Sequence, residues 1–380
     1  MPRYAAVEGG GTTFVVCIAE ESISQPTTII ERTEFPTRTP AETIPEVAKW
    51  LAERDYDSLG VAMFGPIDMD PASPTWGWVT TTPKPGWGNT DVMGPLLKVR
   101  NVPCMFDTDV NAPALEEFRH FARPGESSCA YVTIGTGIGV GLVVNGRCVR
   151  GLVHPEGGHI PTLKRLPDDN FKGVDIWHPW SVEGQCSAPA LASRAGVSQN
   201  ALKDLPDDHE VWDDAAYMLG ALCATLCALL SVERIVLGGG VMLRESLFPK
   251  VRKSMRTILN GYIQHPRVTE DGPSGIDGYI VPSVRGNDAG LWGALALASD
   301  SWKQAAPLPT KSLLAASSAS TAAPAAESSE DSAVEEVLKL PRKRNNVVSV
   351  GYSGAHIGAA FAVGVCATAL VSSVLARRVR

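Results

Sequence analysis

Two glycine-rich stretches decide the fold, VEGGGTT at residues 7–13 and IGTGIGVG at residues 134–141. Each stands between short segments rich in apolar and β-branched residues, a pattern typical of two strands joined by a hairpin. Glycines at such a turn let backbone N–H groups approach a phosphate closely, and the hydroxyls of Thr12 and Thr13 add donors. Either stretch alone is equally typical of a plain turn. Two of them predict one fold unit that is used twice.

A third glycine run, IVLGGGVM at residues 235–242, follows an apolar strand and precedes a helical pattern. This suits a helix N-terminus that faces adenosine or its phosphates, or else an ordinary strand–turn–helix. The sequence contains no GxxxxGK[ST] loop, and hairpins replace the strand–turn–helix of a dinucleotide-binding motif. The two hairpins instead resemble the phosphate clamp of actin-like and hexokinase-like ATPases, in which ATP lies in the cleft between two α/β halves.

The composition limits the class of protein. The chain has 380 residues, 44% of them hydrophobic and 20% charged, which suits two domains with a sizeable core. Nine basic and five acidic residues lie from Lys303 onward, so residues 1–302 hold the other 25 basic and 36 acidic residues. This acidic body is a poor candidate for nucleic-acid binding. Eight scattered cysteines without a CxxC pair indicate reduced thiols, and Glu8 interrupts any N-terminal signal segment.

The C-terminal part has a different character. Residues 303–346 are rich in Ala, Ser, Pro and Glu, which predicts a flexible, disordered linker. Residues 347–375 contain no Asp, Glu, Lys or Arg, and about 20 apolar residues suffice to span a bilayer as a helix. We therefore expect a transmembrane tail anchor with a cytosol-facing body, slightly favouring a mitochondrial or plastid outer envelope. The alternative is a buried terminal helix.

Carboxylates are grouped at the start of a predicted helix in MFDTDVNAP, residues 105–113. An apolar strand delivers Asp107, Thr108 and Asp109 to that point. A carboxylate there can stabilise a helix N-terminus, and Asp107 suits that role. One of the pair can instead accept the proton of a substrate hydroxyl, as phosphoryl transfer requires.

Two further stretches carry carboxylates in loops, HPEGGH at residues 154–159 and WSVEG at residues 180–184. Carboxylates can make paired hydrogen bonds to neighbouring hydroxyls, so Glu156 and Glu183 are candidate sugar ligands. The alternative for each is a surface loop without a ligand.

Taken together and in this order, the motifs resemble the ROK family of sugar kinases, most closely its fructokinase branch. The resemblance covers roughly residues 3–300. The stretches that carry it are FGPID at 64–68, TTTPKPGW at 80–87, DTDVNA at 107–112, HPEGGH at 154–159 and NDAGLWGALALA at 287–298.

The resemblance implies an α/β fold of two actin-like, ribonuclease H-like domains with an interdomain cleft. The domains would comprise residues 1–115 and 116–302, with a terminal helix at 287–300 returning to the first. The implied reaction is ATP-dependent phosphorylation of a hexose, with fructose converted to fructose 6-phosphate. Glucose, mannose or an N-acetylhexosamine are alternative substrates, and a catalytically silent, membrane-tethered sugar-binding protein is an alternative function. Relatives are often homodimers, so the resemblance leaves a homodimer as one option for the oligomeric state of this chain.

The resemblance also implies roles for individual residues. Asp109 would be the catalytic base, and Mg²⁺ would bridge the β- and γ-phosphate oxygens of ATP. The implied ATP-binding residues are Gly10, Gly11, Thr12, Thr13, Gly135, Thr136, Gly137, Gly239 and Gly240. The implied sugar-binding residues are Gly65, Pro66, Asn89, Thr108, Glu156, His159 and Glu183.

Two departures from the family pattern matter. The first hairpin ends in Thr13 where many members carry lysine, so we expect one phosphate-facing charge to be missing. Members also bind a structural zinc through the histidine that corresponds to His159 and through cysteines downstream. Here Asp175 and Ser181 replace those cysteines, and only His159, Asp175 and His178 remain as candidate ligands. Serine is a poor zinc ligand, so we expect a degraded zinc site.

Overall fold

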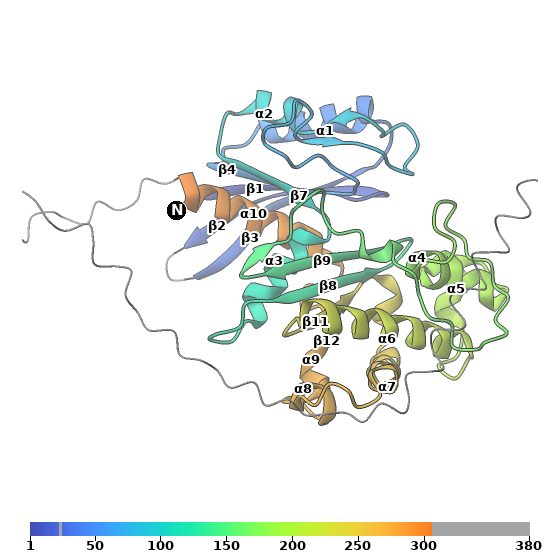
Figure 1. The fold of residues 1–380 in the computed structure, drawn as a ribbon. Helices are drawn as coiled ribbons and strands as arrows, with labels where there is room; N and C mark the ends of the chain where they lie inside the picture. The colour runs from blue at the N-terminus through green and yellow to red at the C-terminus, as the bar shows by residue number, and fades with distance from the viewer. Residues whose placement is uncertain (23–24, 306–380) are drawn as a thin grey trace, which may run out of the picture. The chain divides into compact units, whose positions relative to one another are not determined.

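The computed structural model describes residues 1–22 and 25–305 (Figure 1). These described residues belong to one compact unit. The predicted transmembrane anchor and nearly all of the predicted linker lie outside the described residues, and residues 303–305 belong to the last described helix. The described residues comprise two halves, and each contains one of the glycine hairpins.

The first half contains a mixed five-stranded sheet with the strand order β3-β2-β1-β4-β7 (Figure 1). β2 pairs antiparallel with both β3 and β1, whereas β4 is parallel to β1 and β7 is parallel to β4. All residues of β4 are buried, as expected of a parallel strand that is covered on both faces. The strands are β1 (Arg3–Gly9), β2 (Thr13–Ser22), β3 (Gln25–Pro36), β4 (Ser58–Met63) and β7 (Cys104–Thr108).

The second half repeats this arrangement with the order β10-β9-β8-β11-β12. Its pairings are again antiparallel, antiparallel, parallel and parallel. Each glycine hairpin joins the first and second strand of its own half, so one unit is used twice, as the sequence predicts. The strands are β8 (Cys129–Ile134), β9 (Ile138–Val144), β10 (Arg147–Cys148), β11 (Ile235–Gly238) and β12 (Ile280–Pro282).

Two helices connect the halves. The last described helix, α10 (Ala289–Ala305), packs on β1, β4 and β7 and also against α3 (Asn111–Phe121), which packs on β8 and β9 (Figure 1). Close approach requires glycine at two points. A Cβ at Gly60 in β4 would lie 2.0 Å from the Ala294 oxygen, and one at Gly293 would lie 2.4 Å from the α3 backbone. The domain boundary expected between residues 115 and 116 falls inside α3 and stays a prediction.

The helix α6 (Val211–Leu230) is long and apolar enough to cross a membrane, with a mean hydropathy of 1.4, but 61% of its apolar window is buried. It packs against α7 (Leu247–Leu259) and contributes Trp212, Leu219 and Cys223 to the core of the second half. The helix α6 is therefore a core helix of the second half. The seven cysteines among the described residues are free.

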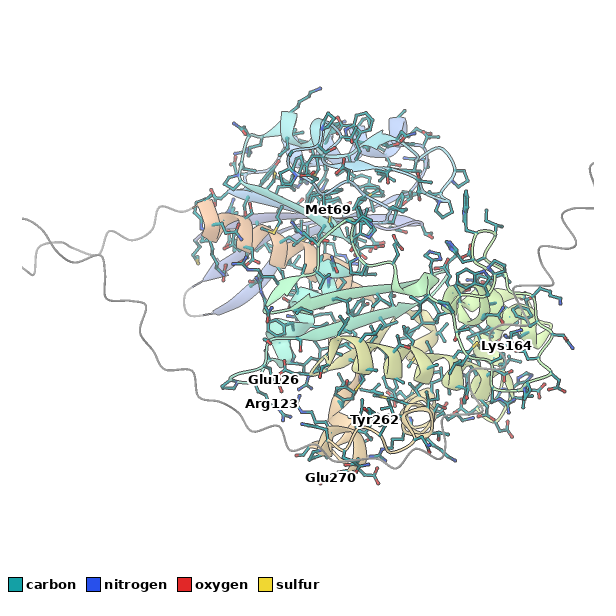
Figure 2. The ribbon with its side chains drawn as sticks, in the orientation of Figure 1. Met69, Arg123, Glu126, Lys164, Tyr262 and Glu270 are labelled. Atoms are coloured by element: carbon teal, nitrogen blue, oxygen red, sulfur yellow. The ribbon has the colours of Figure 1, made fainter. Side chains whose placement is uncertain are left out.

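The remaining elements cover the sheets and form the loops of the site. Side chains fill the space between each sheet and its helices, and Tyr262, 91% exposed, lies on the outer surface of the second half (Figure 2). These elements are α1 (Pro40–Ala52), β5 (Trp78–Val79), β6 (Thr90–Asp91), α2 (Met93–Val99), η1 (Gly157–His159), α4 (Val182–Cys186), α5 (Ala188–Ala195), η2 (Gln199–Asp204), η3 (Gly240–Leu243), α8 (Pro266–Thr269), α9 (Ile276–Tyr279) and η4 (Gly286–Asp288).

Candidate functional site

The first glycine hairpin, Gly10–Thr13, joins β1 to β2. The Gly10 N–H donates to the Thr13 oxygen at 3.0 Å, which closes the turn. Thr37 supports it by donating its hydroxyl to the Gly10 oxygen at 2.7 Å. Gly11 and Thr12 are exposed, and nothing lies within 4 Å of a Cβ built on Gly11. The tip of the turn is therefore free to receive a ligand against its backbone.

The second hairpin, Gly135–Gly137, joins β8 to β9. The Gly135 N–H donates to the Gly137 oxygen at 2.9 Å, which closes the turn. Thr136 at its tip is exposed. Glu183, at the start of α4, accepts a hydrogen bond from the Ile138 N–H at 2.7 Å. A Cβ on Gly137 would lie 2.7 Å from the same carboxylate. The structure thus places the predicted sugar ligand Glu183 beside the second hairpin.

The third glycine run borders a cavity of about 470 Å³ at the end of β11. Gly239 has φ +84°, and a Cβ there would lie 2.5 Å from the Ile134 oxygen, so only glycine fits. Gly240 begins η3. Mostly apolar walls with a few polar groups are typical of a small-molecule site. The lining includes Leu237, Gly238, Gly239, Met242, Leu243, Glu245, Phe248, Pro249, Arg252, Pro282, Ser283, Gly286 and Asn287.

Asp109 lies on the turn between β7 and α3, where its N–H donates to the Met63 oxygen at 3.0 Å. Its side chain is half-buried. Burial, and then the negative charge of Glu156, raise the pKa of Asp109 to about 7. A carboxyl with this pKa can accept and release a proton near neutral pH, as a general base must.

Asp107, two residues earlier, has a structural role. It is fully buried, and its Oδ1 accepts hydrogen bonds from the Thr108 N–H at 2.8 Å and from Asn111 Nδ2 at 3.0 Å. Its Oδ2 accepts from Arg150 Nη2 at 2.8 Å. All its acceptor capacity serves the start of α3 and the segment after β10. Of the two aspartates, Asp107 is therefore committed to structural hydrogen bonds, and the role of Asp109 as the base stays a prediction.

His154 connects the two halves and was given no role from the sequence, although it opens the HPEGGH stretch. Its ring is buried, and Nε2 accepts a hydrogen bond from the Ile67 N–H at 3.0 Å. Nδ1 lies 3.5 Å from Glu156 Oε1. A Cβ on Gly65 would lie 3.1 Å from the ring, so glycine is needed for this contact. His154 thereby holds the Gly65–Pro66 loop next to the Glu156 carboxylate.

Glu8 is a second carboxylate that sequence reasoning missed. It stands at the end of β1, directly before the first hairpin, and a Cβ on Gly290 would lie 2.1 Å from its Oε1. Burial, and then the charges of Asp109 and Asp288, raise the pKa of Glu8 to about 7. The signal in the sequence was an acidic residue immediately before a glycine turn. Carboxylates next to a phosphate loop are suited to a magnesium ion that arrives with a nucleotide.

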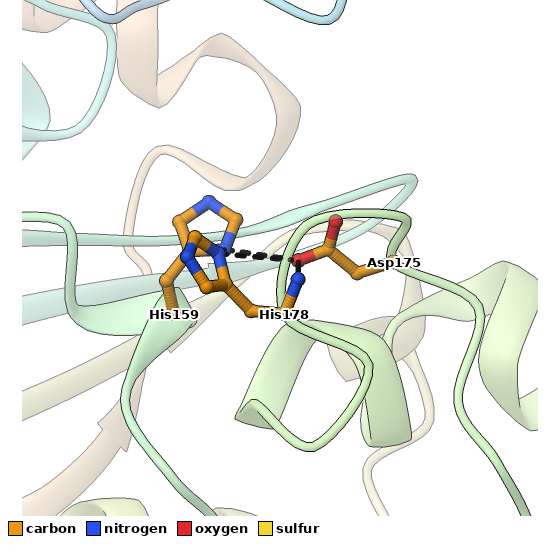
Figure 3. A group of neighbouring side chains, drawn as sticks. All are labelled: His159, Asp175 and His178. Atoms are coloured by element: carbon orange, nitrogen blue, oxygen red, sulfur yellow. Dashed lines mark hydrogen bonds and ion pairs between the residues drawn. The ribbon is translucent and has the colours of Figure 1, made fainter. Parts of the chain in front are cut away.

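His159, Asp175 and His178 lie together, as predicted for a residual metal site (Figure 3). His159 Nδ1 is 3.2 Å from Asp175 Oδ2 and 3.2 Å from His178 Nδ1, and Asp175 Oδ2 is 3.7 Å from His178 Nδ1. Donors bound tetrahedrally to zinc are separated by about 3.3–3.6 Å, so these three atoms fit three corners of a zinc site. Ser181 does not complete it, because its buried hydroxyl accepts from the Gly184 N–H at 3.0 Å.

The predicted sugar ligands are only partly brought together. Glu156 Oε2 lies 3.9 Å from His159 Nε2. Burial raises the pKa of Glu183, and the negative charge of Glu156 raises it further. The hydrogen bond from the Ile138 N–H and the nearby His159 both lower this pKa, so they reduce the rise. Thr108 is buried, and its hydroxyl accepts a hydrogen bond from the Asn111 N–H at 3.0 Å. Asn89 lies exposed on the loop before β6 with φ +57°.

The doubled sheet and the carboxylates gathered near its two hairpins define a two-half α/β protein of the sugar-kinase fold. The fold is similar to a solved ROK hexokinase from Thermus thermophilus, with a TM-score of 0.60 and 24% identity, covering 80% of this chain and 99% of that one. It is also similar to a Streptomyces griseus ROK glucokinase solved with glucose and AMPPNP, with a TM-score of 0.57 and 22% identity, covering 78% and 99%.

The chain belongs to the ROK family, whose family model matches residues 4–301. It is 37% identical over 300 residues to a fructokinase of Pediococcus pentosaceus, covering 79% of this chain and 99% of that protein. It is 37% identical over 301 residues to a fructokinase of Streptococcus mutans, covering 78% and 97%. The family resemblance inferred from the motifs is therefore confirmed.

Proposed function

We propose that this chain is an ATP-dependent fructokinase that converts fructose to fructose 6-phosphate. Its similarity to named fructokinases extends over nearly their whole length, which supports the assignment. The observation that carries the mechanism is Asp109, a half-buried carboxylate with a pKa raised to about 7 and with Glu156 as its charged neighbour.

In this mechanism Asp109 accepts the proton of the sugar O6 hydroxyl as O6 attacks the γ-phosphorus of ATP. The bond from the γ-phosphorus to the β–γ bridging oxygen breaks, and ADP leaves. The γ-phosphoryl charge in the transition state is spread over its oxygens, so catalysis depends on positioned donors and cations. The backbone of Gly10–Thr13 and Gly135–Gly137 supplies donors, and the 470 Å³ cavity beside Gly239 suits the adenosine.

Magnesium would reach the site with ATP and neutralise phosphate charge. Glu8, beside the first hairpin, is the carboxylate suited to hold it. The two halves would act as actin-like domains that close on the substrates and exclude water, which suppresses ATP hydrolysis. His154 and the Arg150–Asp107 ion pair would keep the sugar loop in place during closure.

Glu156, His159 and Glu183 would hold the sugar hydroxyls, together with the loop at Gly65–Pro66. Zinc, where bound by His159, Asp175 and His178, would orient the His159 ring so that Nε2 faces Glu156. That orientation is consistent with the 3.9 Å separation of Nε2 and the Glu156 carboxylate. The role proposed for zinc is therefore structural.

The test is a hexose panel with Mg²⁺ and ATP on the full chain, which measures ADP release and identifies the phosphorylated carbon by NMR. We expect fructose to be preferred over glucose, mannose and N-acetylhexosamines, with phosphate on O6. Asp109→Asn should lower turnover by about 10²- to 10⁴-fold, and Asp208→Asn, an exposed aspartate in the same protein, should not lower it. Preference for another hexose would replace fructose as the substrate. Sugar binding without phosphoryl transfer would favour a sugar-binding protein.

The membrane anchor is proposed on the sequence of residues 347–375 alone. A fluorescent fusion of residues 303–380 should localise to an intracellular membrane. A diffuse cytosolic signal would remove the anchor from the proposal and leave the kinase assignment unchanged.

A further inference from the structure

The loop between β5 and β6 brings a lysine to the first hairpin. Lys84 donates a hydrogen bond from its ammonium group to the backbone oxygen of Gly11. The hairpin itself offers backbone N–H groups and the hydroxyls of Thr12 and Thr13, but no charged side chain. Lys84 therefore brings a positive charge to a turn that otherwise carries none.

The turn that carries Lys84 is rigidly built. The Trp87 N–H donates to the Lys84 oxygen at 3.2 Å, and Gly86 has φ +79°. Proline at the second position and a left-handed glycine at the third are typical of a type II turn, and Pro85 and Gly86 occupy these positions. The turn is a local constraint that holds the lysine backbone in one conformation.

Trp87 ties this turn to the strand that leaves the hairpin. Its ring is fully buried and stacks on Phe14 in β2 at a centroid distance of 5.4 Å. Its Nε1 donates to the Arg38 oxygen at 2.8 Å. Phe14 follows Thr13 directly, so the loop and the hairpin share one packed support. The direction of Lys84 toward Gly11 is thus a consequence of the core.

Nearby cations are already committed to carboxylates. Arg32 pairs with Asp288 at 2.9 Å and with Glu34 at 2.8 Å, and Arg38 pairs with Glu46 at 2.5 Å. Lys84 pairs with no carboxylate among residues 1–22 and 25–305. An ammonium group has three donors, and the Gly11 oxygen takes one of them. Two donors and the full charge remain for an anionic ligand on the hairpin.

We propose that Lys84 is a phosphate-binding catalytic residue that contacts the terminal phosphate of the bound nucleoside triphosphate. The charge lies at the hairpin whose backbone donors face the phosphates in the proposed function, and lysine binds phosphate as a point charge. This inference rests on the proposed function for its kinetic part, because it assigns a further residue to that same site. Its binding part requires only a triphosphate on the first hairpin.

The binding test uses the full chain and calorimetry with magnesium complexes of AMPPNP and of ADP. Lys84→Gln should weaken binding of AMPPNP about 10- to 100-fold, the loss expected for a hydrogen bond to a charged group, and should affect ADP far less. Lys84→Arg, which keeps the charge, should lose less. Lys49→Gln, an exposed lysine on α1, is the matched control and should bind both nucleotides as the wild type does.

Two outcomes of this test would overturn the inference. One is unchanged AMPPNP affinity in Lys84→Gln. The other is an equal loss for ADP and AMPPNP together with a lowered melting temperature, which would make Lys84 a purely structural residue of the loop.

The kinetic test separates this inference from the proposed function. In a chain that phosphorylates fructose, Lys84→Gln should lower kcat with an unchanged KM for fructose. Undiminished kcat would overturn the role of Lys84 and leave the fructokinase assignment intact. If the wild-type chain phosphorylates no hexose, the fructokinase assignment fails, and the nucleotide affinities still decide whether Lys84 contacts the terminal phosphate.

Discussion

The two glycine hairpins occupy equivalent positions in the two halves, yet their surroundings carry opposite charges. Lys84 approaches the first hairpin, whereas the Glu183 carboxylate lies against the second and accepts the Ile138 N–H. A duplicated fold unit therefore does not duplicate its chemistry. The first half is suited to neutralising phosphate, and the second half is suited to holding sugar hydroxyls close to the nucleotide.

Asp109 stands on the turn that leads from the first half to the second and should show the largest effect. Asp109→Asn should lower kcat by about 10²- to 10⁴-fold, the usual contribution of a general base, with nucleotide binding retained. Steady-state kinetics and calorimetry check both parts.

The neighbouring Asp107→Asn is the matched structural control. It removes the charge from the Arg150 ion pair and should destabilise the fold by about 1–3 kcal/mol in denaturant unfolding. The assignment of the base fails if Asp107→Asn stops turnover in a folded protein while Asp109→Asn does not.

Acidification should act on the same carboxylate. Because the pKa of Asp109 is raised to about 7, kcat/KM should fall as pH drops below that value, approaching tenfold per pH unit. A flat profile between pH 5.5 and 8 in a stable protein would contradict this role.

The raised pKa also predicts the direction of a stability change. The ordinary value is 3.8 and the folded value is about 7, so the folded state holds a proton that the unfolded state releases between these values. Stability from this group is therefore present at low pH and is lost as pH rises toward 7. Asp109→Asn should accordingly melt at a higher temperature than the wild type at pH 8, as measured by calorimetry.

Alanine substitutions in the two hairpins sharpen the comparison between them. A Cβ on Gly11 meets nothing within 4 Å, so Gly11→Ala should fold normally. The added methyl group should crowd the bound phosphate and raise KM for ATP about tenfold, which corresponds to a loss of roughly 1.4 kcal/mol in binding free energy. A Cβ on Gly137 would lie 2.7 Å from Glu183, so Gly137→Ala should displace that carboxylate and also raise KM for the sugar. Gly151→Ala, which is open like Gly11 but lies in neither hairpin, is the control. Identical effects on both substrates from Gly11 and Gly137 would remove the distinction between the hairpins.

Metal removal should have the smallest effect. Any zinc that the full chain binds at the second half should be held weakly, as elemental analysis before and after dialysis would show, and His178→Ala should hold none. With Asp175 in place of a thiolate, a chelator should remove the metal readily and lower the melting temperature only slightly, because Trp177 and His178 already donate backbone N–H bonds to Asp175. Absence of zinc from the wild type would show that the three donors form a metal-free hydrogen-bonded cluster.

Local patterns were sufficient for much of this protein. Glycine turns between apolar strands predicted the doubled sheet, and the position of Asp107 before a helix predicted its structural role. These predictions succeeded because backbone conformation at a turn and the charge preference of a helix N-terminus are set by neighbours in the chain. Thr108 accepts a hydrogen bond from the Asn111 N–H at the start of α3, and its role as a sugar ligand stays a prediction.

The residues that were missed owe their roles to contacts between distant segments. Glu8 gains its raised pKa from burial beside Asp109, His154 meets Ile67 across the two halves, and Lys84 reaches Gly11 from 73 residues away. Composition and motif order were enough to assign the family and the repeated unit, and Asp109 as the base stays a prediction. Burial and long-range packing were needed to select which charges face the hairpins, because a side chain's electrostatic environment depends on every segment that folds around it.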